Sequence, residues 1–156
     1  MPFPQRKHPR LCGYDYSSEG IYFLTICTAD RRPILSKIIA SKTNDTASLF
    51  LTEFGKIAEQ YIHSISAAYP NTTVLSYVIM PDHIHLLLQL KRRAESSRPT
   101  VPQIIAAFKR FANRDCGEQI WQDGYYDHIV RSEEDLFVRM EYIETNPLRR
   151  LLKNNP

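Results

Sequence analysis

Residues 74–90 read VLSYVIMPDHIHLLLQL, which is two apolar runs on either side of a Pro-Asp pair. The runs at 74–80 and 84–90 are short and rich in β-branched and aliphatic side chains, which favours strands over helices. Pro81 and Asp82 are residues typical of turns. The stretch therefore predicts two consecutive strands joined by a turn.

The sequence on both sides of this pair completes an α+β pattern. Residues 40–48 are polar and loop-like. The other predicted elements, in chain order, are a strand at 20–29, a helix at 52–68, a helix that follows Thr100, a strand at 125–130, and a helix that follows Ser132 and ends near Pro147. This order predicts a ferredoxin-like β-α-β-β-α-β fold with an antiparallel sheet and an added C-terminal helix. We expect two helices on one face of the sheet and an open second face.

The bulk composition suits a soluble protein of ordinary size. The chain has 156 residues, which favours one domain over 1–156 with a basic N-terminal arm at 1–19. No apolar run approaches the roughly 20 residues that a membrane helix needs, and the N-terminus lacks the apolar part of a signal peptide. Three widely spaced cysteines argue against a disulfide framework or a thiolate zinc site. We therefore predict a cytoplasmic protein with no membrane partner.

Basic residues form four local clusters, although the formal net charge is only +3. Such clusters can contact a phosphate backbone, and a solvated surface is an equally good interpretation of any single one. The predicted nucleic-acid-binding residues are Arg6, Lys7, Arg10, Lys91, Arg92, Arg93, Lys109, Arg110, Arg149 and Arg150.

His83 and His85 are separated by one residue within the second apolar run. In a strand, residues i and i+2 point to the same face, so the two imidazoles should stand side by side, with Ile84 on the opposite face. Two neighbouring imidazoles can chelate a divalent cation. Two polar residues on an exposed strand would be the simpler interpretation, but the apolar character of the run favours metal binding.

The final helix carries a tyrosine and an amide at helical spacing. Tyr142 and Asn146 are four residues apart and share one helix face. Tyr142 lies off the predicted apolar stripe, which consists of Leu136, Phe137, Met140 and Ile143. The ring could pack on a neighbouring element, or its hydroxyl could be a nucleophile one turn from an amide oxygen that binds metal.

Several segments together resemble a known family. VIMPDHIHLLLQL at 78–90, WQDGYYDHIVR at 121–131 and EYIETNPLRR at 141–150 resemble the REP-associated tyrosine transposases, and so does RLCGYDYSSEGIYFLTICT at 10–28. These proteins belong to the HUH single-tyrosine superfamily of insertion-sequence type. The resemblance extends over nearly the whole chain.

The resemblance implies an activity, a metal site and a partner. It implies that Tyr142 is the catalytic nucleophile and that His83, His85 and Asn146 bind Mg²⁺ or Mn²⁺; a glutamine stands at position 146 in the broader insertion-sequence branch. It further implies that the enzyme cuts and joins single-stranded DNA beside a hairpin through a covalent 5′-phosphotyrosine. The protein would then be nucleoid-associated, as a monomer acting in cis or a homodimer.

Other interpretations of the same residues stay open. A ferredoxin-like sheet also serves non-catalytic nucleic-acid-binding modules, although the aromatic RNA-binding pattern is missing. A histidine-triad phosphohydrolase would need a third histidine where Leu87 stands. Tyr125 and Tyr126 are rival nucleophiles, but in a predicted strand they are more simply packing or base-stacking residues.

Overall fold

A computed structural model describes residues 20–40, 47–91 and 99–154. The strands of the main sheet are β1 (Gly20–Cys27), β4 (Thr72–Ile79), β5 (His83–Leu90) and β6 (Tyr126–Val130). Their spatial order is β4-β5-β1-β6, with antiparallel pairing throughout. The predicted ferredoxin-like fold is confirmed.

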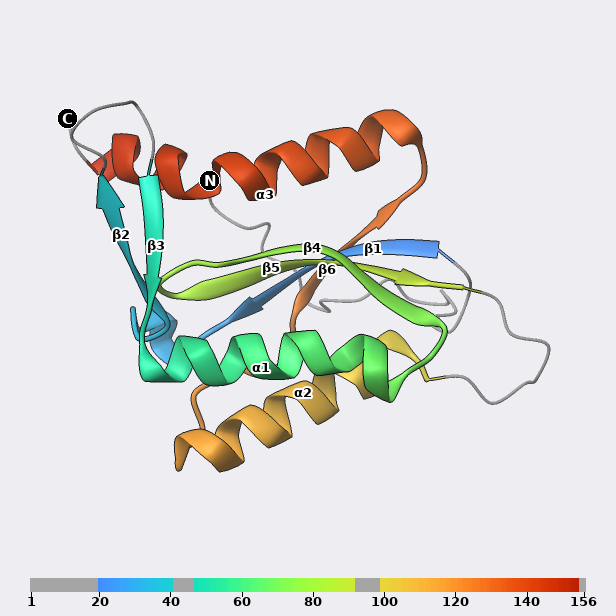
Figure 1. The fold of residues 1–156 in the computed structure, drawn as a ribbon, viewed down its shortest axis with the longest axis horizontal. Coiled ribbons are helices and arrows are strands. Elements are labelled where there is room, and N and C mark those ends of the chain that lie inside the picture. The colour runs from blue at the N-terminus through green and yellow to red at the C-terminus, as the bar shows by residue number, and fades with distance from the viewer. Residues whose placement is uncertain (1–19, 41–46, 92–98, 155–156) are drawn as a thin grey trace.

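Helices cover both faces of this sheet. Figure 1 shows α1 (Glu53–Ala68) and α2 (Val101–Cys116) together on one face, and α3 (Glu133–Asn154) across the other. The prediction of an open second face was therefore wrong, because α3 lies where we expected solvent. Of the helices in the described residues, none combines the length and apolar character needed to cross a lipid bilayer.

The alternation of β5 divides its side chains between two cores. Ile84, Leu86 and Leu88 lie in the core that the sheet forms with α1 and α2. Leu87 belongs to a second cluster, which also contains Phe23, Val78, Met80 and Ile143, with Tyr142 packed against it. Because residues of opposite parity face opposite sides of the sheet, His83 and His85 share the face opposite Ile84, but α3 covers that face.

A two-stranded ribbon was missed. No strand was predicted next to the loop at 40–48, but β2 (Ser36–Ala40) and β3 (Ala47–Leu51) pair in antiparallel fashion and rise beside α3 (Figure 1). Most of the predicted loop, 41–46, lies outside the described residues. Ile38 and Leu49 face the second core, whereas Ile39 and Phe50 are exposed. Apolar side chains thus occur on both faces of short strands, so no period of two was visible in the sequence.

The course of α3 also differs from the prediction. The helix does not end near Pro147 but continues to Asn154 with the proline inside it. Proline removes one backbone hydrogen bond from a helix, so burial of Asn146 and Pro147 and further tertiary contacts must offset that loss. Phe137 is 68% exposed and not part of the buried stripe.

The docking of α1 depends on a glycine. A Cβ atom at Gly55 would lie 2.0 Å from the carbonyl oxygen of Leu35, a contact that backbone atoms cannot tolerate. At the same place Thr52 caps α1 by accepting from the Gly55 amide at 3.1 Å. The close approach of α1 to the chain before β2 therefore requires glycine at position 55.

Replacing Gly55 by alanine should lower the free energy of unfolding by about 2 to 4 kcal/mol, because the steric clash outweighs the higher helix propensity of alanine. Urea denaturation followed by circular dichroism would measure it. Lys56→Ala, at an exposed neighbouring position, is the matched control and should change stability by less than about 0.5 kcal/mol. A Gly55→Ala protein as stable as the wild type would show that α1 does not approach Leu35 so closely.

Candidate metal and nucleophile site

The two histidines of β5 stand side by side under α3. Their ring centroids are 4.6 Å apart and the ring planes are inclined by 70°. Both are buried, His83 at 4% and His85 at 1% exposure. In the antiparallel pairing with β1, His85 lies opposite Thr25 and His83 lies opposite Cys27.

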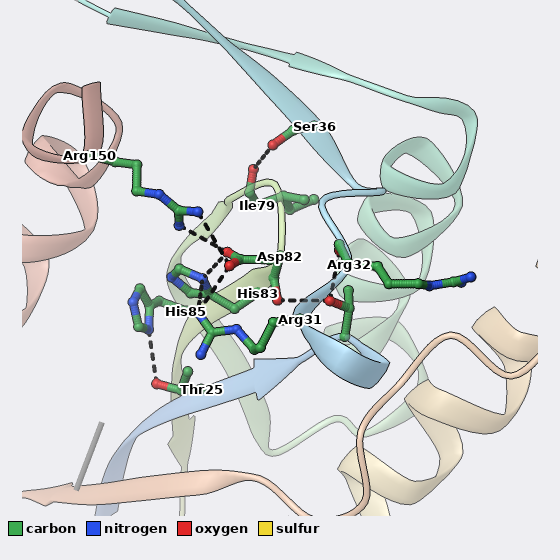
Figure 2. Close-up of polar contacts among 10 residues, drawn as sticks. Thr25, Arg31, Arg32, Ser36, Ile79, Asp82, His83, His85 and Arg150 are labelled. Carbon is green, nitrogen blue, oxygen red and sulfur yellow. Dashed lines mark hydrogen bonds and ion pairs between the residues drawn. The ribbon is translucent and has the colours of Figure 1, made fainter. Parts of the chain in front are cut away.

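Each imidazole is oriented through its Nδ1 atom (Figure 2). His83 Nδ1 donates to Asp82 Oδ1 at 2.8 Å, and His85 Nδ1 shares a hydrogen bond with Thr25 Oγ1 at 2.9 Å. A histidine that binds a metal through one ring nitrogen commonly has the other held by a carboxylate, hydroxyl or carbonyl. The donor set therefore fits a cation bound through the two Nε2 atoms.

The environment keeps both imidazoles neutral, which is the form that binds a metal. Burial lowers the pKa of His83, and the hydrogen bond to Asp82 opposes this only in part. Burial lowers the pKa of His85 well below its ordinary value, and the positive charges of Arg31 and Arg139 add to the effect.

Asp82 is surrounded by cationic side chains. Arg150 of α3 contacts both of its carboxylate oxygens, at 3.0 and 3.3 Å, and Arg31 contacts Oδ2 at 3.2 Å. Burial alone would raise the pKa of Asp82, but the hydrogen bonds from His83 and Arg150 outweigh it and hold that pKa far below its usual range. The carboxylate is therefore ionised at neutral pH.

Arg31 reaches this carboxylate from an unusual backbone. Asp30 and Arg31, in the short 3-10 turn Ala29–Arg31, have φ values of 55° and 54°. Non-glycine residues adopt this left-handed conformation at a cost of about 1 kcal/mol or more each. The strain brings the Arg31 guanidinium within 3.5 Å of His83 Nδ1.

Tyr142 lies beside His85. Its ring centroid is 5.2 Å from that of His85, and the guanidinium carbon of Arg149 lies 5.5 Å from the centroid of the same tyrosine ring. Asn146, one helical turn further on, is 7% exposed. We predicted that Tyr142 would point away from the core of its helix; instead it lies on the half-buried face with which α3 packs on the sheet.

A metal at this place would need a ligand besides histidine. Among the residues that the structure describes, no group of three or more His, Cys, Asp or Glu side chains is placed to hold a metal ion. The amide oxygen of Asn146 is a ligand of a different class, and its helix covers the two imidazoles. The trio of His83, His85 and Asn146 therefore stays a prediction.

The predicted DNA-binding residues are spread over the molecule. Lys109 donates from Nζ to the carbonyl oxygens of Gln122 and Gly124 and so closes the loop before β6. Arg110 is exposed beside Phe111, and Lys91 is exposed at the end of β5. Arg149 and Arg150 lie at the site itself. The remaining members lie outside the described residues: Arg6, Lys7, Arg10, Arg92 and Arg93.

The two rival tyrosines face opposite sides of the sheet: Tyr125 directly precedes β6, and Tyr126 is its first residue. Tyr125 is 5% exposed and belongs to the core under α1 and α2. Tyr126 is the cross-strand partner of Thr25 and therefore shares the face of the sheet that carries the histidines. Of the two, Tyr126 is the one that the geometry leaves as a rival to Tyr142.

The family described as "Transposase IS200 like" matches residues 17–146, which include β1, both histidines, Tyr142 and Asn146. The chain belongs to the IS200-like transposase family. The family predicted from the sequence motifs is confirmed, and membership places the chain among DNA-processing enzymes.

Relatives and solved structures agree with this assignment. Two proteins of Haemophilus influenzae are similar to the chain. One, of uncharacterised function, is 29% identical over 92% of this chain and 88% of its own length. The other, a proposed REP-associated tyrosine transposase, is 27% identical over 86% of this chain and 74% of its own.

Two solved structures share the fold. A REP-associated tyrosine transposase bound to a REP hairpin superposes with a TM-score of 0.63 at 19% identity, covering 96% of this chain and 74% of that one. A proposed transposase of Deinococcus radiodurans gives a TM-score of 0.52 at 20% identity, covering 87% and 95%. At these identities the likeness concerns the fold alone.

Removing either histidine of β5 should remove metal binding. We expect His83→Ala and His85→Ala each to weaken Mn²⁺ binding by about a hundredfold or more, because each deletes one ligand and leaves too few. Titration of free Mn²⁺ by electron paramagnetic resonance would measure the affinity. His63→Ala is the matched control, because His63 lies on α1, on the other face of the sheet, where it pairs with Tyr77. Equal losses in all three proteins would contradict the assignment.

Proposed function

We propose that this protein is a metal-dependent enzyme that nicks and joins single-stranded DNA beside a hairpin, with Tyr142 as its nucleophile. The observation that carries the proposal is the position of the Tyr142 ring, 5.2 Å from His85 of the same chain. Membership of the IS200-like transposase family supports it. Because one chain supplies both groups, a monomer holds a whole candidate site, which favours action in cis.

The chemistry exchanges one phosphate ester for another. The Tyr142 oxygen forms a bond to phosphorus and the bond from phosphorus to the 3′-oxygen breaks. The phenolic proton is lost, and the departing 3′-oxygen takes up a proton to become a 3′-hydroxyl. The DNA 5′-phosphate stays on Tyr142, and because the ester bond is kept, a later 3′-hydroxyl can attack it to rejoin DNA without a nucleotide cofactor.

His83, His85 and Asn146 would hold the Mg²⁺ or Mn²⁺. When bound, the ion supplies positive charge that polarises a phosphate oxygen and positions the scissile bond. The protein contributes orientation. Thr25 and Asp82 fix the two imidazoles, and the packing of α3 on the sheet brings Tyr142 over them.

Exposed basic side chains beside the site and farther along the sheet suit a DNA strand. Arg149 is exposed beside Tyr142, and Lys91 is exposed at the far end of β5. A solved relative in fold is bound to a REP hairpin, which makes a hairpin-flanked strand the partner that we propose. Lys109 and Arg150 are committed to contacts within the chain, so among the described residues the proposal rests on Lys91, Arg110 and Arg149.

Tyr142→Phe should abolish the covalent adduct while DNA binding stays within about twofold, because the change removes one oxygen and leaves the ring. A denaturing gel of end-labelled, hairpin-flanked single-stranded DNA would show the adduct, and mass spectrometry would map the modified peptide. Tyr126→Phe is the matched control, because Tyr126 faces the same side of the sheet, and it should keep the adduct. An adduct that maps to Tyr126 would transfer the nucleophile to that residue. A wild-type protein that binds hairpins and Mn²⁺ but never forms an adduct would favour a non-catalytic binding module.

Affinity for DNA should fall steeply with salt, because contacts with the phosphate backbone release counterions. We expect the affinity to drop at least tenfold between 50 and 200 mM salt, as a rough estimate for a few phosphate contacts. Fluorescence anisotropy with a labelled hairpin carrying a single-stranded flank would measure it, and a blunt duplex of the same sequence would be the control. Equal affinity for both DNAs would contradict recognition of a single strand.

A further inference from the structure

The Asp82 carboxylate joins three segments that are distant in the sequence. It accepts from His83 at the start of β5, from Arg31 after β1, and from Arg150 on α3 (Figure 2). Its backbone is fixed as well, since the Asp82 carbonyl oxygen accepts from the amide and the hydroxyl of Thr28, at 3.0 and 3.1 Å. Only 10% of the side chain is exposed.

The contact with Arg150 anchors α3 where the helix is weakest. Pro147 lacks the amide hydrogen that would bond to the carbonyl oxygen of Ile143, so the backbone ladder is interrupted one turn after Tyr142. Arg150 lies three residues beyond the proline and grips both oxygens of Asp82. A bidentate pair of this kind fixes direction as well as distance.

We propose that Asp82 is the positioning residue of the site and that one carboxylate sets both the metal-binding imidazole and the helix of the nucleophile. Through His83 it holds the proton on Nδ1 and so presents Nε2 to the metal. Through Arg150 it fixes the C-terminal half of α3 and thereby sets the distance between Tyr142 and His85. The inference rests on the proposed function, since it assigns these roles within that site.

The same helix supplies a matched control. Asp135, near the N-terminus of α3, also joins a histidine and an arginine: His128 at 2.6 Å and Arg139 at 3.2 Å. These two bonds anchor the N-terminal end of α3, and neither of them involves a histidine of β5. Asp135→Asn therefore removes an Asp-His-Arg network of the same kind without removing the orienting contact of His83.

Two measurements that need no DNA test the proposal: the dissociation constant for Mn²⁺, and amide hydrogen exchange along α3. Asp82→Asn should weaken Mn²⁺ binding about 10- to 100-fold, as expected when the partner of a ligating histidine is lost, and should speed exchange after Pro147. Arg150→Met should speed exchange there at least tenfold and should weaken Mn²⁺ binding less than Asp82→Asn does, because the contact of Asp82 with His83 stays. Arg150→Lys, which keeps the charge, should restore part of the protection. Asp135→Asn should speed exchange only near its own end of α3.

Unchanged Mn²⁺ affinity in Asp82→Asn, or unchanged protection of α3 in Arg150→Met, would overturn the proposal. If Asp82→Asn does not fold, the Arg150 variants still decide whether this contact holds the helix. A wild-type protein that binds no Mn²⁺ would overturn the metal half of the role. Absence of a DNA adduct in the wild type would instead remove the proposed function and leave the two measurements on Asp82 unaffected.

Discussion

A buried carboxylate is stable only when enough donors compensate for the water it has lost, and in this fold the donors that Asp82 recruits shape the site. Two guanidinium groups and an imidazole converge on it from the turn after β1, from α3 and from His83. Because the charge cannot be left unpaired, those three segments must come together. The strained backbone at Arg31 and the continuation of α3 past Pro147 are both tolerated where this pairing requires them.

The second constraint is the period of two along β5. Leucine and isoleucine side chains on one face seal the core under α1 and α2, so the intervening histidines must face α3. Burial then keeps both imidazoles neutral, while Asp82 and Thr25 orient them. Fold stability and the geometry of the proposed metal site thus depend on the same strand.

The sequence predicted those features that depend on local patterns: the element order, the shared face of His83 and His85, and the start of α2 directly after Thr100. It failed where long-range packing decides, as in the β2–β3 ribbon and the side of α3 on which Tyr142 lies. Asp82 stood next to the histidines and was interpreted only as a turn residue. Thr25 and Arg31 could not be found without the strand register that brings β1 beside β5. A carboxylate directly before His-x-His was the one local signal that pointed to an orienting role.

The central claim is that two histidines of β5 and an amide of α3 hold one cation beneath Tyr142. Crystals grown with Mn²⁺ and measured at a wavelength where manganese scatters anomalously would test it most directly. The account predicts a single strong peak about 2.1 Å from the Nε2 atoms of His83 and His85 and from the side-chain oxygen of Asn146. A peak bound through Nδ1, a peak that Asn146 does not approach, or no peak between the histidines would contradict it.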